Sequence, residues 1–398
     1  MVDLTANSSL AIKAQSAPAT YAAPTSADAI PVANLSWRPT PIQSDNPEYR
    51  GSIHRPGPIV LGASYDVTFD ILLRGPGGAS PPAADAFIPG RVLRALGFTE
   101  NVVSAAIPAA AEALTAGGTT TTANLGVSAV ATDDLYTGLA IQLASLGTIG
   151  QPASLAMIRD YIGTGKVAHI AQTAGGAYSG NYQIPKQLAY TLAATGTPPV
   201  LSFSLWQGNR RYNFLDMAPS SARLIFPTAS RGGGSDYPRL SCTFSGDAQS
   251  DLDEAAPVVT SSVAIPPFKG GKQHVSGLAM GGSSISLDLG TRVGFPPNPN
   301  KTSGSDPAQL TETRRTLTLD LNQVSKSFLD LQALAAAQAE HAIQLLYGLA
   351  SGNYVGFVAT HARLNYPEAQ AGGDFFTTRG DAYVDGAEKT IGLTFPYY

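Results

Sequence analysis

Histidine and cysteine are the residue types in this chain that could bind a metal ion or attack a substrate. The histidines are His54, His169, His274, His341 and His361. No two of them have the HxxxH or HExxH spacing that places both imidazoles on one helix face. The one cysteine, Cys242, has no partner for an internal disulfide and occupies an inward position of an expected strand. The sequence therefore predicts neither a metal site nor a thiol nucleophile.

Acidic residues offer the next candidate chemistry, because paired carboxylates can act as acid and base or hold calcium. Asp133-Asp134 is one such group, and Asp251, Asp253 and Glu254 form another. We interpret both groups as solvated acidic turns. The chain also lacks the GxSxG motif of serine hydrolases and the GxxxxGK[ST] phosphate loop. The sequence therefore offers no candidate catalytic residue for an enzymatic function, and we expect no cofactor.

The composition is typical of short strands with many turns, in a protein whose surface is covered by neighbours. Charged residues make up 14% of the chain, against about 25% in ordinary globular proteins. There are 41 glycines and 29 prolines. The net charge of −4 argues against a basic surface for nucleic acid. We therefore expect an oligomer, and we interpret Arg210-Arg211 and Arg314-Arg315 as salt-bridge partners at its interfaces.

Targeting signals are missing from the sequence. The first residues, MVDLTANSSLAIKAQ, lack a basic region followed by an apolar one, which a signal peptide needs. No run of 18 apolar residues occurs, so we expect no membrane span. These features predict folding in a cytoplasm, and a bacterial one is favoured.

Period-two alternation predicts strands along much of the chain. In Arg211–Asp247 we expect three short strands, the last with Leu240, Cys242 and Phe244 inward, and a glycine-rich reversal at 231–236. A further strand is expected at Ser64–Leu73. Other expected strands include Leu201–Leu205, Ser284–Leu289, Thr316–Leu321 and Tyr354–Ala362. The Asp385-Gly386 dipeptide indicates a hairpin that ends in a last strand at Lys389–Phe395.

Two segments have helical patterns. Ala86–Leu96 is expected to form a short helical turn. Ser325–Gly348 is expected to be the one long helix, with an apolar stripe that includes Leu331, Ala335 and Leu345 and with His341 in solvent. The expected fold class is therefore mainly β, a β-sandwich or barrel with a flanking α-helix and β-rich insertions.

The chain divides into three parts by composition. Residues 1–41 are rich in Ala, Ser, Thr and Pro, and we expect an N-terminal arm that becomes ordered only against a partner. Residues 42–98 and 200–398 are expected to form the β-sandwich core. Residues 99–199 are expected to be an inserted outer subdomain, with apolar runs that read as strands.

Three stretches together resemble bacteriophage tail tube proteins, the major tail proteins of long-tailed, siphovirus-like phages. The first is Asn46–Gly75, a polar loop followed by an alternating strand, with a Gly-Phe pair after the small helix at Arg94–Phe98. The second, Asn209–Asp247, is similar to the family's strand, Pro-Ser turn and strand ending in Phe-Ser-Gly. The third runs from Phe357–Arg363 to the final hairpin. The chain is longer than many members of the family.

The resemblance implies a structural protein of the virion, assembled in the host bacterial cytoplasm. Six copies would close into a ring, and rings would stack into a tube. The implied partners are other copies of this chain, the tape measure protein, the tail terminator and the distal tail proteins. Double-stranded DNA would pass through the lumen without specific binding. In such proteins a long hairpin from each subunit contributes to a continuous inner β-barrel, and a long loop reaches the adjacent ring.

Two groups of residues are candidates for these roles. On the Ser64–Arg74 strand, Asp66, Thr68 and Asp70 form the polar side and are the candidate lumen-facing residues, which predicts an acidic channel that repels DNA phosphates. The segment Ile42–Gly62 is the candidate inter-ring loop. Its candidate contact residues are Glu48, Tyr49, Arg50, His54 and Arg55.

Three other functions remain open at the level of sequence. A capsid or decoration protein is the first, although a capsid protein usually has a long helix earlier in the chain. A β-rich surface adhesin is the second, and the missing signal peptide counts against it. A polysaccharide-acting enzyme is the third, and it would need two positioned carboxylates in an aromatic groove.

Overall fold

The structure is a computed structural model. It describes residues 8–45, 57–193, 198–228, 237–259, 263–298, 306, 309–313, 315–321, 325–348, 350–372, 375–384 and 389–398. Within these ranges the fold is mainly β, with large antiparallel sheets and two α-helices. None of these helices is both long enough and apolar enough to cross a membrane. The expected mainly β fold class is therefore confirmed.

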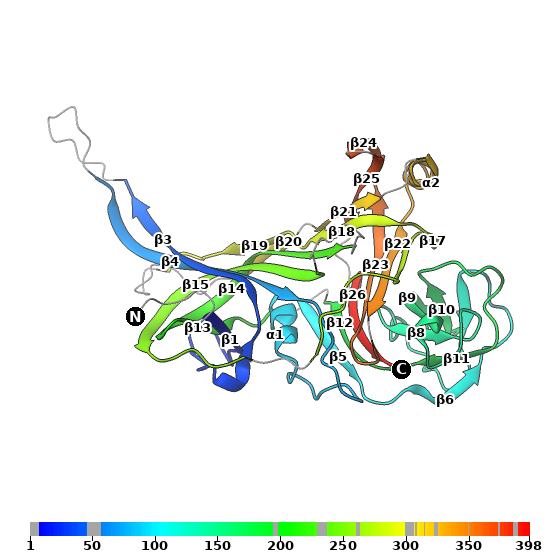
Figure 1. Cartoon of the computed structure of the whole chain (residues 1–398), viewed down its shortest axis with the longest axis horizontal. Helices are drawn as coiled ribbons and strands as arrows, with labels where there is room; N and C mark the ends of the chain where they lie inside the picture. The colour runs from blue at the N-terminus through cyan, green and yellow to red at the C-terminus, as the bar shows by residue number, and fades with distance from the viewer. Residues whose placement is uncertain are drawn as a thin grey trace.

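The first layer is a long antiparallel sheet with the strand order β3-β4-β15-β14-β18-β21-β25-β24 (Figure 1). Its strands are β3 (Ala33–Ser44), β4 (Ile59–Leu72), β14 (Arg210–Pro227), β15 (Arg239–Asp253), β18 (Gly282–Asp288), β21 (Arg315–Leu321), β24 (Glu368–Gly372) and β25 (Phe375–Val384). A short hairpin, β19 (Thr291–Gly294) and β20 (Gln309–Thr313), lies beside β14. β3 and β4 project from one end of the molecule (Figure 1).

The second layer has the strand order β5-β12-β26-β23-β22-β16-β17. Its strands are β5 (Phe98–Val103), β12 (Lys186–Leu192), β16 (Lys272–Val275), β17 (Leu278–Ala279), β22 (His341–Gly348), β23 (Tyr354–Leu364) and β26 (Ile391–Tyr397). β23 also pairs with β25, which joins the two layers at a corner. At the other end, β1 (Ser8–Ala14), β2 (Ala29–Ile30) and β13 (Leu201–Gln207) continue from β14.

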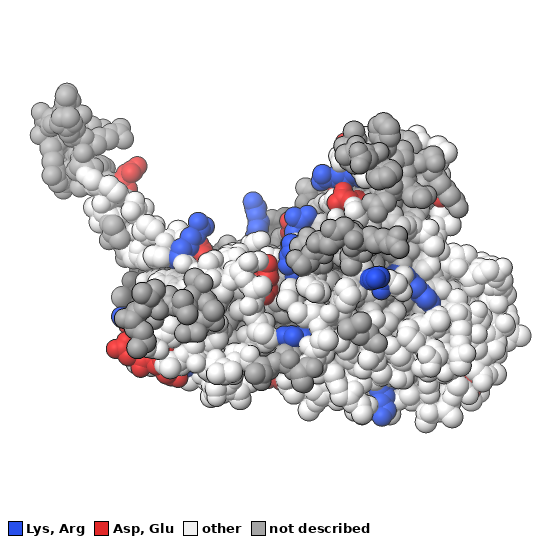
Figure 2. Space-filling view, in the orientation of Figure 1, with Lys and Arg blue, Asp and Glu red and all other residues white. Residues whose placement is uncertain are grey.

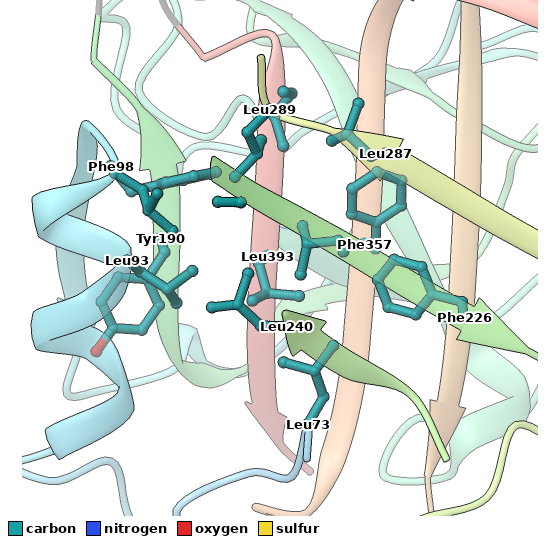
Figure 3. Close-up of a cluster of buried hydrophobic side chains, with 14 of the residues drawn as sticks. Leu73, Leu93, Phe98, Tyr190, Phe226, Leu240, Leu287, Leu289, Phe357 and Leu393 are labelled. Atoms are coloured by element: carbon teal, nitrogen blue, oxygen red, sulfur yellow. The ribbon is translucent and has the colours of Figure 1, made fainter. Parts of the chain in front are cut away.

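The main core fills the space between the layers, because alternate residues of each strand point inward. Phe226 and Leu240 of the first layer face Phe357 and Leu393 of the second (Figure 3). The helix α1 (Ile88–Ala95) covers one side and buries Leu93 and its neighbours. The helix α2 (Ser325–Ala336) packs on β23 and β25. This core fixes the outward face of the long sheet.

Residues between β5 and β12 form a separate six-stranded sheet, which we call the inserted unit. Its strand order is β6-β11-β8-β9-β10-β7, and it has its own core. The strands are β6 (Ile107–Ala113), β7 (Thr122–Asn124), β8 (Ala140–Leu143), β9 (Leu155–Ile162), β10 (Val167–Ile170) and β11 (Asn181–Ile184). It lies at the end opposite the β3–β4 projection (Figure 1). This arrangement agrees with an insertion, while the division into domains stays a prediction.

The inserted unit is fastened to the second layer by buried amides. Gln344 of β22 is fully buried; its Oε1 accepts a hydrogen bond from the Met157 amide at 2.8 Å, and its Nε2 donates to Gln172 Oε1 at 3.2 Å. Gln187 of β12 makes two hydrogen bonds with the main chain of Ala140: its Oε1 accepts from the amide, and its Nε2 donates to the carbonyl. Buried polar groups with complete partners fix one docking geometry.

The prediction of one long helix over Ser325–Gly348 is wrong for the second half of that range. The helix ends at Ala336, and His341–Gly348 is the strand β22. Ile343 and Leu345 face the main core, while Leu346 faces the inserted unit. A strand that is buried on both sides has no polar alternation, so its apolar run resembles a helix. The histidine expected in solvent, His341, is consequently buried.

Three smaller expectations are also wrong. The N-terminal segment was expected to become ordered only against a partner, but residues 8–41 pack within the chain: β1 pairs with β13 and buries Leu10 and Ile12. The segment Arg211–Asp247 contains two strands rather than three, because β14 continues through the expected Pro219 turn with shifts in register. The last two strands do not form a hairpin: β26 pairs with β12 and β23, and β25 with β21, β23 and β24. The expected turns at 231–236 and 385–386 lie outside the described residues.

Candidate assembly surface

The outward side of the long sheet is lined by Ser, Thr, Asp and Arg, and we call it the polar face. Its residues are Arg38 on β3, Asp66, Thr68 and Asp70 on β4, Arg239, Ser241, Thr243 and Ser245 on β15, Ser221 and Arg223 on β14, Ser284, Ser286 and Asp288 on β18, Thr316, Thr318 and Asp320 on β21, and Arg379 and Asp381 on β25, together with the apolar Ile225 and the aromatic Tyr383. Apart from Arg38, each alternates with buried neighbours such as Val67, Phe69 and Leu319. One row of the ladder runs Asp70, Ser241, Arg223, Asp288 and Thr316 across five strands.

The structure places all three candidate residues of β4 on this face. Asp66 accepts hydrogen bonds from Ser245 Oγ at 2.5 Å and Thr40 Oγ1 at 3.0 Å. The hydroxyls of Thr68 and Thr243 are 3.1 Å apart. Asp70 is buried, with 6% of its surface exposed, and accepts a 2.7 Å bond from Asn34 Nδ2. The three residues share one side of β4, and whether they line a channel stays a prediction.

The charges on the polar face are mixed rather than acidic. Arg38 Nε lies 3.5 Å from Asp66 Oδ2, and Arg239 Nε lies 3.8 Å from Asp70 Oδ2. Farther along, Arg223 Nη2 donates to Ser286 Oγ at 2.7 Å. Figure 2 shows basic and acidic side chains spaced along the concave side between the β3–β4 projection and β24, β25 and α2. Because the carboxylates of β4 have arginine partners, the local surface carries both signs.

The two outer strands of the long sheet each have one free side. Among the described residues, β3 pairs only with β4 and β24 pairs only with β25. An edge strand offers a row of main-chain N–H and C=O groups to another strand, which proteins usually cover or block. The polar face therefore lies between two edges that can accept a neighbour.

Sequence reasoning missed most of the polar face. The alternation of Ser284–Leu289 and Thr316–Leu321 was visible, but only the pairing of strands shows that their polar sides are continuous with β4. Long-range register has no local signal in a single sequence. The expected inter-ring contacts Glu48, Tyr49, Arg50, His54 and Arg55 lie outside the described residues.

The arginine pair Arg210-Arg211 forms ion pairs within the chain, and a role for it at a subunit interface stays a prediction. Arg210 pairs with Asp251, and Arg211 Nη1 bonds Glu254 Oε2 at 2.9 Å. Hydrogen bonding to Arg210 holds the pKa of Asp251 below its usual value. These contacts fasten the outer ends of β14 and β15 together. The other pair includes Arg314, which lies outside the described residues.

The reactive residue types have structural surroundings. Cys242 is buried, and burial raises the pKa of its thiol. Burial and the nearby charge of Lys272 lower the pKa of His274 to about 4. His341 Nε2 is 3.1 Å from the Leu334 carbonyl, so it donates there and its Nδ1 accepts from Ser276 Oγ at 3.0 Å. The group that orients this histidine is a main-chain carbonyl, not the carboxylate of a catalytic triad.

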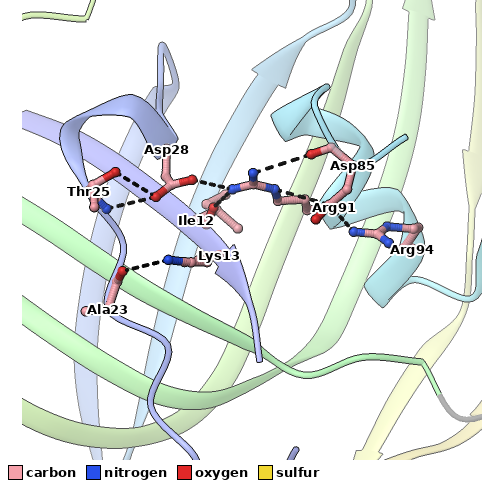
Figure 4. Close-up of polar contacts among 8 residues, drawn as sticks. All are labelled: Ile12, Lys13, Ala23, Thr25, Asp28, Asp85, Arg91 and Arg94. Carbon is pink, nitrogen blue, oxygen red and sulfur yellow. Dashed lines mark hydrogen bonds and ion pairs between the residues drawn. The ribbon is translucent and has the colours of Figure 1, made fainter. Parts of the chain in front are cut away.

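A charged cluster near α1 joins the N-terminal segment to the rest of the fold (Figure 4). Arg91 Nη1 donates to Asp28 Oδ1 and to the Ile12 carbonyl, both at 2.7 Å. Asp28 also accepts two 2.9 Å bonds from Thr25. Burial raises the pKa of Asp28, but the bonds from Arg91 and Thr25 outweigh it and leave that pKa lowered. Across the described ranges, no three His, Cys, Asp or Glu side chains gather as a metal site.

The sequence matches no protein-family model and no curated protein.

Proposed function

We propose that this chain is the structural subunit of a phage tail tube, assembling as stacked rings around a lumen. The observation that carries the proposal is the polar face, which spans the long sheet between β3 and β24, two edge strands that pair on one side only among the described residues. The tape measure protein and then genomic DNA would pass through this lumen. The chain's role is then structural rather than enzymatic, and its place is the virion.

Ring closure follows from the edges of the sheet. In a ring, the edge of one copy pairs with an edge of the next, so the sheets join into a barrel whose inner surface is the polar face. Closure satisfies the free main-chain groups that would otherwise promote aggregation. It also accounts for a chain with only 14% charged residues, because much of its surface becomes covered. The resemblance to tail tube proteins supports six copies in each ring.

Passage of DNA suits the mixed charge of the polar face. Duplex DNA binds proteins mainly through lysine and arginine contacts to phosphates. On the polar face, Arg38 and Arg239 face Asp66 and Asp70, which compete with phosphate for the guanidinium groups. Hydroxyl groups cover much of the remainder. Such a surface neither attracts nor strongly repels a polyanion, so DNA slides along it.

Negative-stain electron microscopy of the purified chain tests the assembly. We expect hollow rings or tubes with one constant diameter. Monodisperse monomers at every concentration would contradict the proposal. Closed shells, or binding to preformed capsids, would instead indicate the capsid or decoration alternative, and attachment to cell surfaces would indicate an adhesin.

Cysteine accessibility tests which surface faces the lumen. Because Cys242 is buried, a single cysteine introduced at Ser221 on the polar face is the main reactive thiol. We expect a bulky maleimide to label Ser221→Cys in monomers but not in assembled tubes. Ala109→Cys, exposed on β6 of the inserted unit, is the matched control and labels in both states. Equal labelling of both variants in tubes would place the polar face outside.

A further inference from the structure

A preformed cavity lies at the junction of β2, the end of β4 and the first turn of α1. Its volume is about 300 Å³. Most of its wall is apolar and includes Ile30, Leu72, Phe87 and Val263. This site begins where the polar face ends on β4, at Leu72 opposite Arg239. The first turn of α1 closes it from the core side of the sheet. A concave site lined mostly by apolar residues, with a few polar groups, is the usual form of a small-ligand site.

Among the described residues that line this cavity, Arg74 is the only charged one. Its side chain is half-buried, and burial lowers its pKa. Its Nη1 donates to the Val263 carbonyl at 3.1 Å, which is the one acceptor that the described residues provide. A guanidinium carries five N–H groups in a planar fork, so most of its hydrogen-bonding capacity remains available.

The walls around Arg74 are fixed by hydrogen bonds. Asn353 Oδ1 accepts from the Gly75 amide at 3.1 Å, and its Nδ2 donates to the Ala264 carbonyl at 2.8 Å. Tyr397 Oη donates to the Gly77 carbonyl at 3.0 Å. Gly77 has φ +74° and packs against Val263, so a side chain there would be strained and would clash. The cavity therefore exists before any ligand arrives, which lowers the cost of binding.

The charge near the cavity is unbalanced. Three acidic residues directly precede lining residues, and each has a partner elsewhere: Asp28 and Asp85 pair with Arg91 and Arg94. Asp70 accepts from Asn34 and lies beside Arg239. No side chain caps the first turn of α1 at Phe87, and that turn also lines the cavity. Both features favour a negative ligand at Arg74.

We propose that this cavity binds a carboxylate carried on a small apolar body, with the carboxylate on the Arg74 guanidinium and the body against Ile30, Leu72 and Phe87. The carboxylate belongs either to a free organic acid or to a peptide that ends in an apolar residue. Recognition is the same in both cases: a forked pair of hydrogen bonds and a desolvated apolar contact.

Phenylacetate and its neutral isostere phenylacetamide are the first probes. They are titrated into the full chain, and the methyl NMR signals of Ile30, Ile88 and Val263 report on the cavity. We expect saturable shifts with phenylacetate and binding of phenylacetamide weaker by about tenfold or more. Equal affinity for both compounds, or no saturable shift at these methyls, would overturn the proposal.

Variants and peptides complete the test. Arg74→Gln is expected to lose the preference for the acid, Arg74→Lys to keep part of it because the charge remains without the fork, and Arg223→Gln on the polar face to change nothing. If Arg74→Gln does not fold, Arg74→Lys still decides the outcome. A short peptide with a C-terminal phenylalanine, free or amidated, separates the two sources: binding of the free form alone identifies a peptide terminus, and failure of both identifies a free acid.

Discussion

At the scale of single residues, the Arg91–Asp28 ion pair holds the N-terminal segment on α1. Both side chains are largely buried, with 14% and 12% of their surfaces exposed. We expect Asp28→Asn to lower the free energy of unfolding by about 3 kcal/mol, because a buried guanidinium loses the more buried of its two counter-charges. Urea titration at neutral pH measures the change.

Asp85 provides the matched control for this pair. It bonds the same arginine from a position that is 50% exposed. Asp85→Asn should cost about 1 kcal/mol or less, since water screens exposed ion pairs. Equal losses in the two variants would show that burial does not set the strength of this cluster.

The Asp28 ion pair also makes stability depend on pH. Because the pKa of Asp28 is lowered in the folded chain, its contribution to stability is present above the ordinary pKa of 3.8 and disappears as the pH falls below that value.

His274 makes stability depend on pH in weak acid. Burial and the charge of Lys272 lower its pKa from 6.5 to about 4 in the folded chain. Between these values the unfolded chain takes up a proton that the folded chain does not, so stability falls as the pH drops from 6.5 to 4. The loss reaches at most about 3 kcal/mol. His274→Gln should flatten this part of the curve, as followed by thermal melts across that range. The half-exposed His361→Gln is the surface control, and an unchanged slope in His274→Gln would contradict the assignment.

At the scale of elements, the proposed ring depends on the edge strand β24. Successive residues of a strand point their N–H groups to opposite sides. Proline has no N–H group. One of the two variants Ala369→Pro and Gln370→Pro therefore removes a main-chain hydrogen bond to β25, and the other removes only an N–H group that points outward from the sheet. We expect the variant that keeps the stability of the monomer to abolish tubes in electron microscopy. If it assembles normally, β24 is not the pairing edge.

The sequence predicted elements better than it predicted their connections. Alternation located β4, β13, β18 and β21, because apolar and polar residues alternate along each of them. It failed at β22, where Ile343 and Leu346 are buried on opposite sides and leave no periodicity. It also failed at β14, whose shifts in register at Leu215 and Pro219 resemble a turn. Asp66, Thr68 and Asp70 share one side of β4, but their arginine partners come from other strands.

At the scale of the whole molecule, the inserted unit connects to the sandwich at two adjacent points. Val103 at the end of β5 pairs with Gln187 of β12, and Ile107 pairs with Ile184 just inside the inserted unit. The chain therefore leaves and re-enters the second layer between two neighbouring strands. The inserted unit covers a small apolar cluster on that layer, including Leu346 and Val358. Its position at the end opposite the β3–β4 projection leaves the polar face open (Figure 1).

This topology predicts that the inserted unit is dispensable for assembly but not for full stability. Replacing residues 104–186 by Asn-Gly joins β5 and β12 through a two-residue hairpin turn at an existing antiparallel pair. The melting temperature should fall, because Leu346 and Val358 lose their cover and Lys272 loses its acceptors, the carbonyls of Ala153 and Leu155. Tubes should still form with the same lumen and a smaller outer diameter, as measured by electron microscopy. A folded variant that no longer assembles would instead place the inserted unit in the contacts between subunits, and the edges β3 and β24 would then not suffice to close the ring.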